Sequence, residues 1–455
     1  MTRLSMTAGS LFAAARGMLA GSVIGLAVMA TAAHAEQAPA AQGQPIDLTT
    51  ALRLAGANNL DLALTREAER QAKAASDAAT LSFFPWLQVG QIYARRTGND
   101  QQTTGVMVDV DRQLYRRGAS FAIAIDLGDA LFRKLAALQL QNAAVHNVDA
   151  QRNDALLAAA NAYFDLVNSV AEIDIARDAV RISHDYQDQL DRAVAIGLTN
   201  RSEALRVAVR TQENEVTLRA AEAQQRRDSA ALAVVLRLDP KVALEPRERV
   251  VMPLTLVPLD TPLDRLVARA LELRPEVEAS TAAITAAEHQ RTAAKYAPLI
   301  PSISAAATYA QTRGGPNGIL DAYQPTHDYV VGLNWRFGPG GLFDFSRTEA
   351  AESVLARQRI SAEKLRQSIS QQVVDALSAA QAARDQMVLA RKGVQLAEQS
   401  LKLSTARREF GVYVVLEVIQ AQQDLTRARS NYAAALAQFA KAQYSLARAT
   451  GNIGD

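Results

Sequence analysis

The side chains in this sequence that could perform chemistry are few and widely separated. There is no cysteine, so the chain offers no thiol nucleophile, no disulfide and no cysteine metal ligand. We find no phosphate-binding loop, metal-ligand spacing or nucleophile motif. The five histidines are scattered, and one of them falls within the first 35 residues: His34, His146, His184, His289 and His327. The sequence therefore predicts a protein that is not an enzyme and that uses no cofactor or metal.

Two glutamates are placed more regularly, each six residues after a glycine that ends a long helical run. Glu203 follows Gly197, and Glu417 follows Gly411. The glycines predict turns, because glycine readily adopts the left-handed conformation found after helix C-termini. Asn200 and Glu203 also have the spacing of a capping box, so Glu203 has an alternative role in starting a helix. The residues before Glu417 offer no such cap.

These turns belong to a repeat that covers most of the chain. Tyr163 corresponds to Ala376, an offset of 213 residues, and Pro85 corresponds to Pro301, an offset of 216. A repeat of this length is not a solenoid unit of 20–50 residues. We predict two structural repeats, residues 46–239 and 262–455, joined by a proline-rich link over residues 240–261.

Two stretches without proline predict very long helices. Residues 127–196 and 342–410 contain no proline and a single glycine each. A helix of about 69 residues spans roughly 100 Å, too long to be buried in a globular core. Shorter helices are predicted over 46–81, 200–238, 262–297 and 414–449, with Pro275 dividing the third of these. The abundant alanines allow close approach of helices, so the sequence predicts either a coiled coil or a wall of antiparallel helices.

Four short segments change from helical to alternating periodicity. The clearest is 328–337, which places five large apolar residues on one face: Tyr329, Val331, Leu333, Trp335 and Phe337. Hairpins over about 86–128 and 302–337 would supply four strands, each close to the roughly ten residues that cross a bilayer. Four strands are too few to close a barrel, and open edges cannot face lipid. Either the sheet belongs to a soluble domain, or several chains pool their strands, and three chains would give twelve.

Aromatic side chains bear on that choice. Trp86 opens the first strand and Trp335 lies near the end of the last, so both fall at the end of the sheet beside the helices. Tryptophan and tyrosine gather at membrane interfaces. Trp86, Trp335, Tyr329 and Phe337 are therefore predicted as membrane-interface aromatics. The alternative is that the tryptophans anchor an ordinary core.

The N-terminus predicts export. Residues 1–35 have the features of a signal peptide: Arg3 and Arg16 without acidic residues, an apolar run over 17–30, and Ala33-His34-Ala35 as cleavage site. The alternative, a retained membrane helix, conflicts with the short apolar run. Residues 36–45 predict a flexible tail. Without the two arginines of the signal, the 49 basic residues fall to the number of acidic ones, 47, so no nucleic-acid binding is predicted.

Taken in order, these motifs resemble the TolC family of outer membrane efflux channels, also called outer membrane factors. The resemblance rests on the turn-and-helix at 197–203 and 411–417 and on the run 333–337 with the glycine-rich 338–344. It also rests on Leu273-Arg274-Pro275-Glu276, answered by Asn59-Leu60-Asp61. It implies a mainly α protomer with a small β part. Three protomers would form a homotrimeric tunnel, a 12-stranded β-barrel in outer membrane lipid continued by an α-barrel into the periplasm of a Gram-negative bacterium.

The resemblance also implies a function, partners and site residues. Substrates would pass from an inner-membrane transporter of the RND or ABC type, with a periplasmic adaptor docked at the helical tips. Glu203, Glu417 and Gln420 would line a periplasmic gate, and Gly197 and Gly411 would form tip turns where the adaptor docks. The family's second acidic ring is not matched, because Arg206 and Gln420 occupy its positions. The function that fits best is small-molecule efflux. Type I protein secretion and metal export use the same scaffold and are alternatives. A periplasmic coiled-coil adaptor is the alternative from a different class of protein.

Overall fold

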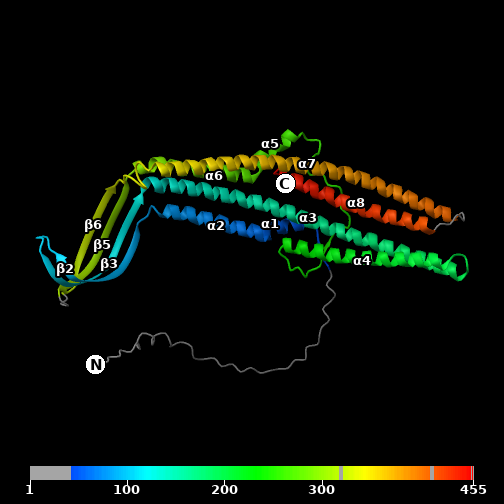
Figure 1. Cartoon of the computed structure of the whole chain (residues 1–455), viewed down its shortest axis with the longest axis horizontal. Coiled ribbons are helices and arrows are strands. Elements are labelled where there is room, and N and C mark those ends of the chain that lie inside the picture. Colours follow the sequence, from blue (N-terminus) through cyan, green and yellow to red (C-terminus); the bar gives the residue numbers. More distant parts are fainter. Residues whose placement is uncertain (1–42, 317–320, 410–414, 452, 454–455) are drawn as a thin grey trace, which may run out of the picture. The chain divides into compact units, whose positions relative to one another are not determined.

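The order of elements in the first half of the chain occurs again in the second half (Figure 1). The computed structural model describes residues 43–316, 321–409, 415–451 and 453, so the predicted signal peptide and Gly411 lie outside the described residues. The first half comprises α1 (Leu48–Asn58), α2 (Leu60–Leu81), β2 (Trp86–Gln101), β3 (Met107–Asp126), α3 (Leu127–Ala195) and α4 (Arg201–Val235). The second half comprises α5 (Leu263–Leu273), α6 (Pro275–Tyr296), the 3-10 turn η1 (Ala297–Leu299), β5 (Ser302–Pro316), β6 (Gln324–Asn334), α7 (Phe345–Glu409) and α8 (Val415–Ala449).

A short parallel pair of strands lies outside this repeat. β1 (Gln44–Ile46) pairs with β4 (Leu244–Pro246), and the N–H of Arg247 donates to the carbonyl of Ile46 at 2.9 Å. The predicted flexible tail over 36–45 therefore ends earlier than expected, since residues 44 and 45 are in a strand. The partner strand lies about 200 residues away in the sequence, beyond the reach of a local pattern.

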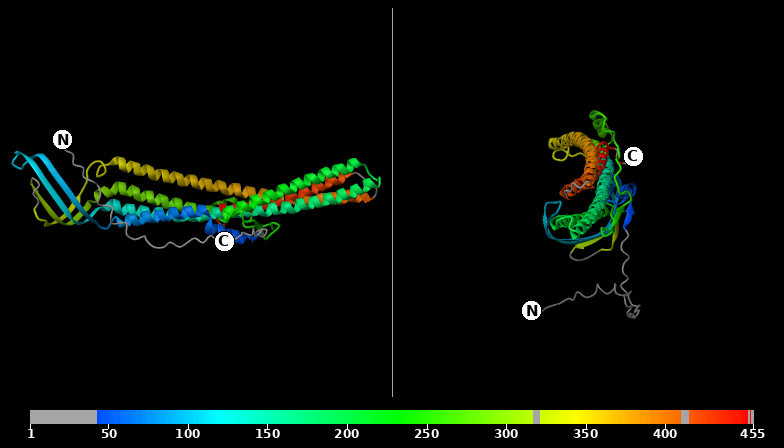
Figure 2. Two further views of the ribbon diagram at one scale, coloured as in Figure 1. Left: turned by 90° about the horizontal axis from the view of Figure 1, so that it is seen from below. Right: turned by 90° about the vertical axis from the view of Figure 1, so that its right-hand side faces the viewer.

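The long helices α3 and α7 organise the helical wall. Near the sheet, α3 packs against α2 and α6, and α6 packs against α7. Further from the sheet, α3 packs against α4 and α8, and α7 packs against α8 (Figure 2). Two shorter helices thus follow one another along each long one. The 69 residues of α3 span roughly 100 Å, as the sequence predicted.

The helix predicted over residues 46–81 is broken at Asn59, and that prediction was wrong. Asn59 has a ψ of 137°, and its side-chain oxygen accepts hydrogen bonds from the N–H groups of Asp61 at 2.9 Å and Leu62 at 3.3 Å. Asparagine competes in this way with the helical pattern and starts a new helix instead. The break at Pro275 between α5 and α6 is confirmed.

The four remaining strands form one antiparallel sheet in the order β2-β3-β5-β6. β6 ends at Asn334, three residues before the predicted end at Phe337. The cause is a tight turn in which Gly338, Gly340 and Phe343 all have positive φ, at 98°, 76° and 71°. Phe337 bridges to Leu342 within this turn and leaves the sheet. Trp335 likewise lies just past the strand, where its indole N–H donates to the carbonyl of Leu299 at 3.4 Å.

The largest hydrophobic cluster lies where helices from both halves meet. It joins α1, α3, α4 and β4 of the first half to α8 of the second, and it contains Leu166, Leu232 and Leu436. A second cluster joins α5, α7 and α8 around Leu266, Ile369 and others. Alanines make up many of the buried positions, which lets the helix backbones come close. Among the described helices, none combines the length and apolarity needed to cross a membrane.

Candidate functional site

The tip of the first helical hairpin is closed by Gly197. Its φ is +75°, and the N–H of the following residue, Leu198, donates back to the carbonyl of Ala193 at 2.9 Å. This is the arrangement that commonly ends an α-helix. A side chain added at Gly197 would meet nothing within 4 Å, so the backbone conformation and not space requires glycine here. The corresponding Gly411 lies outside the described residues.

Glu203 lies in the first turn of α4 and is paired with Arg206. Its carboxylate is 3.3 Å from the guanidinium of Arg206, and its side chain is 27% exposed. The side chain of Asn200 makes no capping hydrogen bond, so the alternative of a capping box is not observed. The helix N-terminus favours a negative charge at this place. The neighbouring arginine nevertheless offsets part of the negative potential that Glu203 would present.

Glu417 and Gln420 lie in the first turns of α8. Glu417 is half-buried and Gln420 is exposed. Between them, Ile419 packs on a small cluster formed by Leu190 of α3 with Ala204 and Val207 of α4. This cluster brings the starts of α4 and α8 together against one face of α3. The side chains predicted for the gate thus come from neighbouring helices.

A cavity of about 480 Å³ lies between the two hairpins near these turns. Its walls come from all four helices: Tyr186 of α3, Asn214 of α4, Thr405 of α7, and Gln422 and Thr426 of α8. Both polar and apolar side chains line it. No group of three or more His, Asp or Glu within the described residues is placed to hold a metal ion.

The sheet has two chemically different faces. Register places Leu87, Phe121, Ala307 and Tyr329 in one row across the four strands. Neighbouring rows on this face carry further exposed apolar side chains, among them Val89, Tyr309, Val331 and Leu333. On the other face, Ser120 and Thr308 are hydrogen-bonded at 2.9 Å, and Arg116 pairs with Asp328 at 2.7 Å. One face therefore suits lipid and the other suits water.

Trp86 falls on the polar face by this alternation. It pairs with Ala122, which lies on the same face as the polar residue Ser120 and two residues after it along β3. Trp86 is 53% exposed, and Tyr329 on the apolar face is 78% exposed. The location of the four aromatic residues at the membrane interface stays a prediction. Of the four, Tyr329 is the one that lies within the apolar rows of the sheet.

The passage from β6 into α7 is held by Asp344. Its carboxylate accepts hydrogen bonds from the hydroxyl of Ser346 at 2.7 Å and from the backbone N–H groups of Gly340 at 2.8 Å and Arg347 at 3.1 Å. These hydrogen bonds, that of Ser346 above all, lower the pKa of Asp344. Arg347 also forms an ion pair with Asp129 at the start of α3. The sheet is thus fixed to both long helices.

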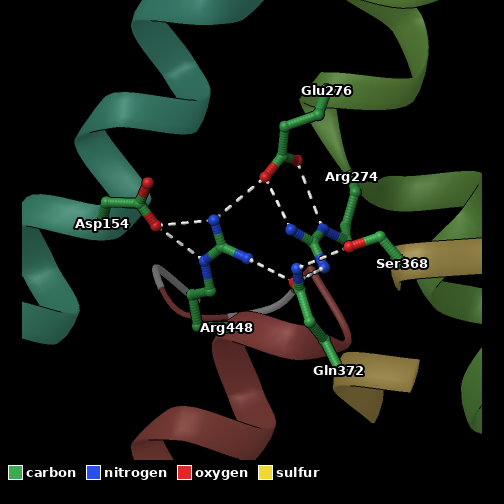
Figure 3. A network of polar contacts seen from close by, with 6 residues as sticks. All are labelled: Asp154, Arg274, Glu276, Ser368, Gln372 and Arg448. Carbon is green, nitrogen blue, oxygen red and sulfur yellow. Dashed lines mark hydrogen bonds and ion pairs between the residues drawn. The ribbon is translucent and has the colours of Figure 1, made fainter. Parts of the chain in front are cut away.

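A polar network joins the two halves at mid-length of the helical wall (Figure 3). It connects α3, α7, α8 and the break between α5 and α6. The residues drawn are Asp154, Arg274, Glu276, Ser368, Gln372 and Arg448.

Glu276 is the acid that both arginines of the network share. Arg274 donates to its two oxygens at 3.3 and 2.7 Å, and Arg448 donates to one of them at 3.0 Å. Arg448 also pairs with Asp154 at 2.6 Å. Burial by itself raises the pKa of Glu276, but the hydrogen bonds from Arg274 and the charges of both arginines leave it below the ordinary value of 4.5. The side chain of Arg274 is only 3% exposed, so these contacts are screened little by solvent.

Comparison with known proteins agrees with this architecture. The model of the family described as "Outer membrane efflux protein" matches residues 266–452. A membrane protein from Pseudomonas aeruginosa has the same fold, with a TM-score of 0.76 and 20% identity over 89% of this chain and 92% of that one. The CmeC outer membrane channel of Campylobacter jejuni gives a TM-score of 0.74 and 17% identity over 90% and 87%. Over residues 266–452, the chain matches the outer membrane efflux protein family.

A curated relative in sequence is nodulation protein T of Rhizobium leguminosarum bv. viciae. It is 31% identical over 192 residues, which make up 41% of this chain. The matched part spans 36% of that relative's length. The fold is therefore shared with these channels over nearly the whole chain, whereas the sequence match to the family covers residues 266–452, and activity and partners are proposed below.

Two features of the structure were missed from the sequence. The shared acid Glu276 and its partner Arg274 were noted only as part of a motif, although charged residues flanking a helix-breaking proline were a usable signal. Arg448 gave no local signal, because its role depends on α8 ending beside the α5–α6 break. The second missed feature is a pair of arginines, Arg117 and Arg313, on the apolar sheet face, where strand alternation could have placed them.

Proposed function

We propose that this protein is the outer membrane channel of a tripartite efflux system and acts as a homotrimer. The observation that carries the proposal is a four-stranded sheet with one apolar face, one polar face and two open edges. Open edges cannot face lipid, so the strands must be completed by other copies. Three copies would supply twelve strands, enclose a polar lumen and turn the apolar faces toward the bilayer.

The length of the helical wall also supports a channel. α3 and α7 extend roughly 100 Å from the sheet, enough to carry a tunnel well into the periplasm. At the far end, Glu203, Glu417 and Gln420 would form rings in the trimer and constrict the opening. Carboxylates gathered around one opening favour cations. Arg206 beside Glu203 weakens the first ring, so Glu417 is the stronger candidate for selectivity.

The partners in this proposal are a periplasmic adaptor and an inner-membrane transporter, which would hand substrate to the tips around Gly197 and Gly411. In-cell crosslinking at residues near the tips, followed by mass spectrometry, tests it. Recovery of an antiporter of the resistance-nodulation-division type supports small-molecule efflux. Recovery of an ATP-binding-cassette transporter supports type I protein secretion. Recovery of the protein outside outer-membrane fractions refutes the channel.

The gate can be tested separately in planar bilayers. Glu417→Gln should lower the preference of the open channel for cations, because it removes three carboxylates from the trimer. Glu363→Gln, on α7 near the sheet, is the matched control and should leave selectivity unchanged. Equal selectivity in both variants would exclude a gate at Glu417.

A further inference from the structure

Two arginines on the apolar face of the sheet have no acidic partner among the residues that the structure describes. Arg117 of β3 and Arg313 of β5 lie one row apart, beyond the apolar rows that contain Phe121 and Tyr309. Arg117 donates only to the amide oxygen of Gln311, at 2.9 and 3.1 Å. Among the described residues, no carboxylate pairs with either guanidinium. Within the described part of the protomer, no acidic side chain therefore neutralises their positive charges.

Tyrosine rings hold these guanidinium groups in place. The guanidinium carbon of Arg313 is 4.8 Å from the ring centre of Tyr115 and 4.7 Å from that of Tyr323. The guanidinium of Arg117 lies 4.2 Å from the same Tyr323 ring. Cation–π contacts position a cation without cancelling its charge. The Nε of Arg313 is shielded from solvent and has no hydrogen-bond partner among the described residues, so its donor capacity is unused.

The other arginines of the outer part of the sheet are all paired. Arg95 contacts Asp111 at 2.9 Å, on the same face as Arg117. The remaining pairs lie on the polar face: Arg96 with Asp100 at 2.6 Å, Arg112 with Asp100 at 3.1 Å, and Arg116 with Asp328 at 2.7 Å. The lack of an acid beside Arg117 and Arg313 is therefore a local feature and not a general property of these strands.

The position of the pair matches the margin of a bilayer. Eight residue steps separate Ile303, at the helix end of the apolar face, from Gln311 beside Arg117, which is roughly 26 Å along the strand. A tilted strand crosses the bilayer in about 9–11 residues, and residues 303–311 are nine residues, so the two arginines lie at about that margin. β3 and β5 are the two inner strands, so copies joining at the β2 and β6 edges would leave this face uncovered.

We propose that Arg117, Arg313, Tyr115 and Tyr323 bind the phosphate of a phosphorylated glycolipid headgroup in the outer leaflet. The inference rests on the proposed function, since it requires the sheet to span the outer membrane. Arginine forks match the oxygens of a phosphate and can bind it through two parallel hydrogen bonds. Tyrosine rings suit the boundary between acyl chains and headgroups. A trimer would carry three such sites, one on each protomer.

Native mass spectrometry of the full-length trimer, titrated with bisphosphorylated lipid A, tests the proposal. The unaltered protein should bind up to three lipid molecules. Arg117→Gln/Arg313→Gln should weaken binding about 20- to 30-fold, from the loss of two cations near the membrane surface. Arg96→Gln/Arg112→Gln removes the same charge from the opposite face and should bind lipid A as the unaltered protein does.

The outcomes separate this proposal from the channel itself. Equal lipid binding by both double variants overturns the site, as does binding of inorganic phosphate alone where lipid A does not bind. If the first double variant fails to assemble, Arg117→Gln carries the test, because that side chain is exposed and its loss should still weaken binding about fivefold. A chain that forms no trimer even when unaltered would contradict the proposed function instead.

Discussion

Glu276 is predicted to stabilise the helical wall through its contacts with two arginines. Glu276→Gln keeps the shape of the side chain but removes the negative charge that Arg274 and Arg448 share. Arg274 is 3% exposed and Arg448 is 17% exposed, so two largely buried cations would then face a neutral amide. Asp154 would remain as an acidic partner of Arg448, whereas Arg274 would have only neutral acceptors, among them the amide oxygen of Gln372 at 2.8 Å.

The size of the effect follows from these contacts. Removing one partner of a buried ion pair costs about 3–5 kcal/mol. Glu276 is 20% exposed, and the new amide oxygen still accepts a hydrogen bond, so about 2–3 kcal/mol is expected here. For roughly 400 ordered residues, the entropy of unfolding is about 0.85 kcal/mol per kelvin. The thermal midpoint should therefore fall by about 3 °C.

Circular dichroism melts of the detergent-solubilised protein would measure this shift at pH 7. Asp61→Asn is the matched control, because Asp61 has the place of Glu276 in the first repeat but is exposed. Its midpoint should change by less than about 1 °C. The pKa of Glu276 is lowered by folding, so its contribution is complete above its ordinary value of 4.5 and is lost as the pH falls through the lower folded value. The difference between the unaltered protein and Glu276→Gln should therefore shrink toward pH 3.

Two results would refute this reasoning. One is a Glu276→Gln midpoint at pH 7 that is indistinguishable from that of Asp61→Asn. The other is a difference that stays the same from pH 7 to pH 3, since a protonated Glu276 should behave as the amide does.

Two further predictions concern the tip and the core. Gly197→Ala should destabilise the tip turn by about 1 kcal/mol, because a side chain disfavours the φ of +75° at this position. Amide hydrogen exchange of residues 193–203 should then be about fivefold faster. Unchanged exchange would contradict the requirement for glycine in this turn. The pKa of Tyr163 is raised by burial and by the hydrogen bond from its hydroxyl to Glu248, so folding favours the protonated form and stability is lost as the pH rises above its ordinary value of 10. Tyr163→Phe should lower the free energy of unfolding by about 1 kcal/mol at pH 7. Between pH 9 and pH 11, however, the variant should lose less stability than the unaltered protein. Denaturant unfolding at each pH would measure both effects.

Much of the fold could be predicted because its signals are local. The absence of proline over residues 127–196 predicted a single helix, and α3 extends over Leu127–Ala195. Strict alternation predicted the two faces of β5 and β6. The break at Asn59 was missed because asparagine also occurs within helices, and its capping role depends on how the following turn starts.

Less of the site could be predicted, since it depends on contacts between distant segments. The spacing of Asn200 and Glu203 suggested a capping box, but the structure pairs Glu203 with Arg206. The contact between Arg448 and Asp154 spans 294 positions, and no local pattern encodes it. The gate and the docking turns remain predictions, because they require the assembled trimer and include Gly411, outside the described residues.

The main hydrophobic cluster has a consequence for biogenesis. Leu166 and Leu232 of the first half are buried partly by Leu436, Tyr444 and Ile453, from the last part of the chain. A polypeptide emerges from the ribosome N-terminus first. The first repeat therefore has to wait, with its apolar surface incompletely covered, until the final helix is available. Although the two repeats share one order of elements, the first cannot complete its core without α8 of the second, so its apolar surface would have to be protected until α8 is in place.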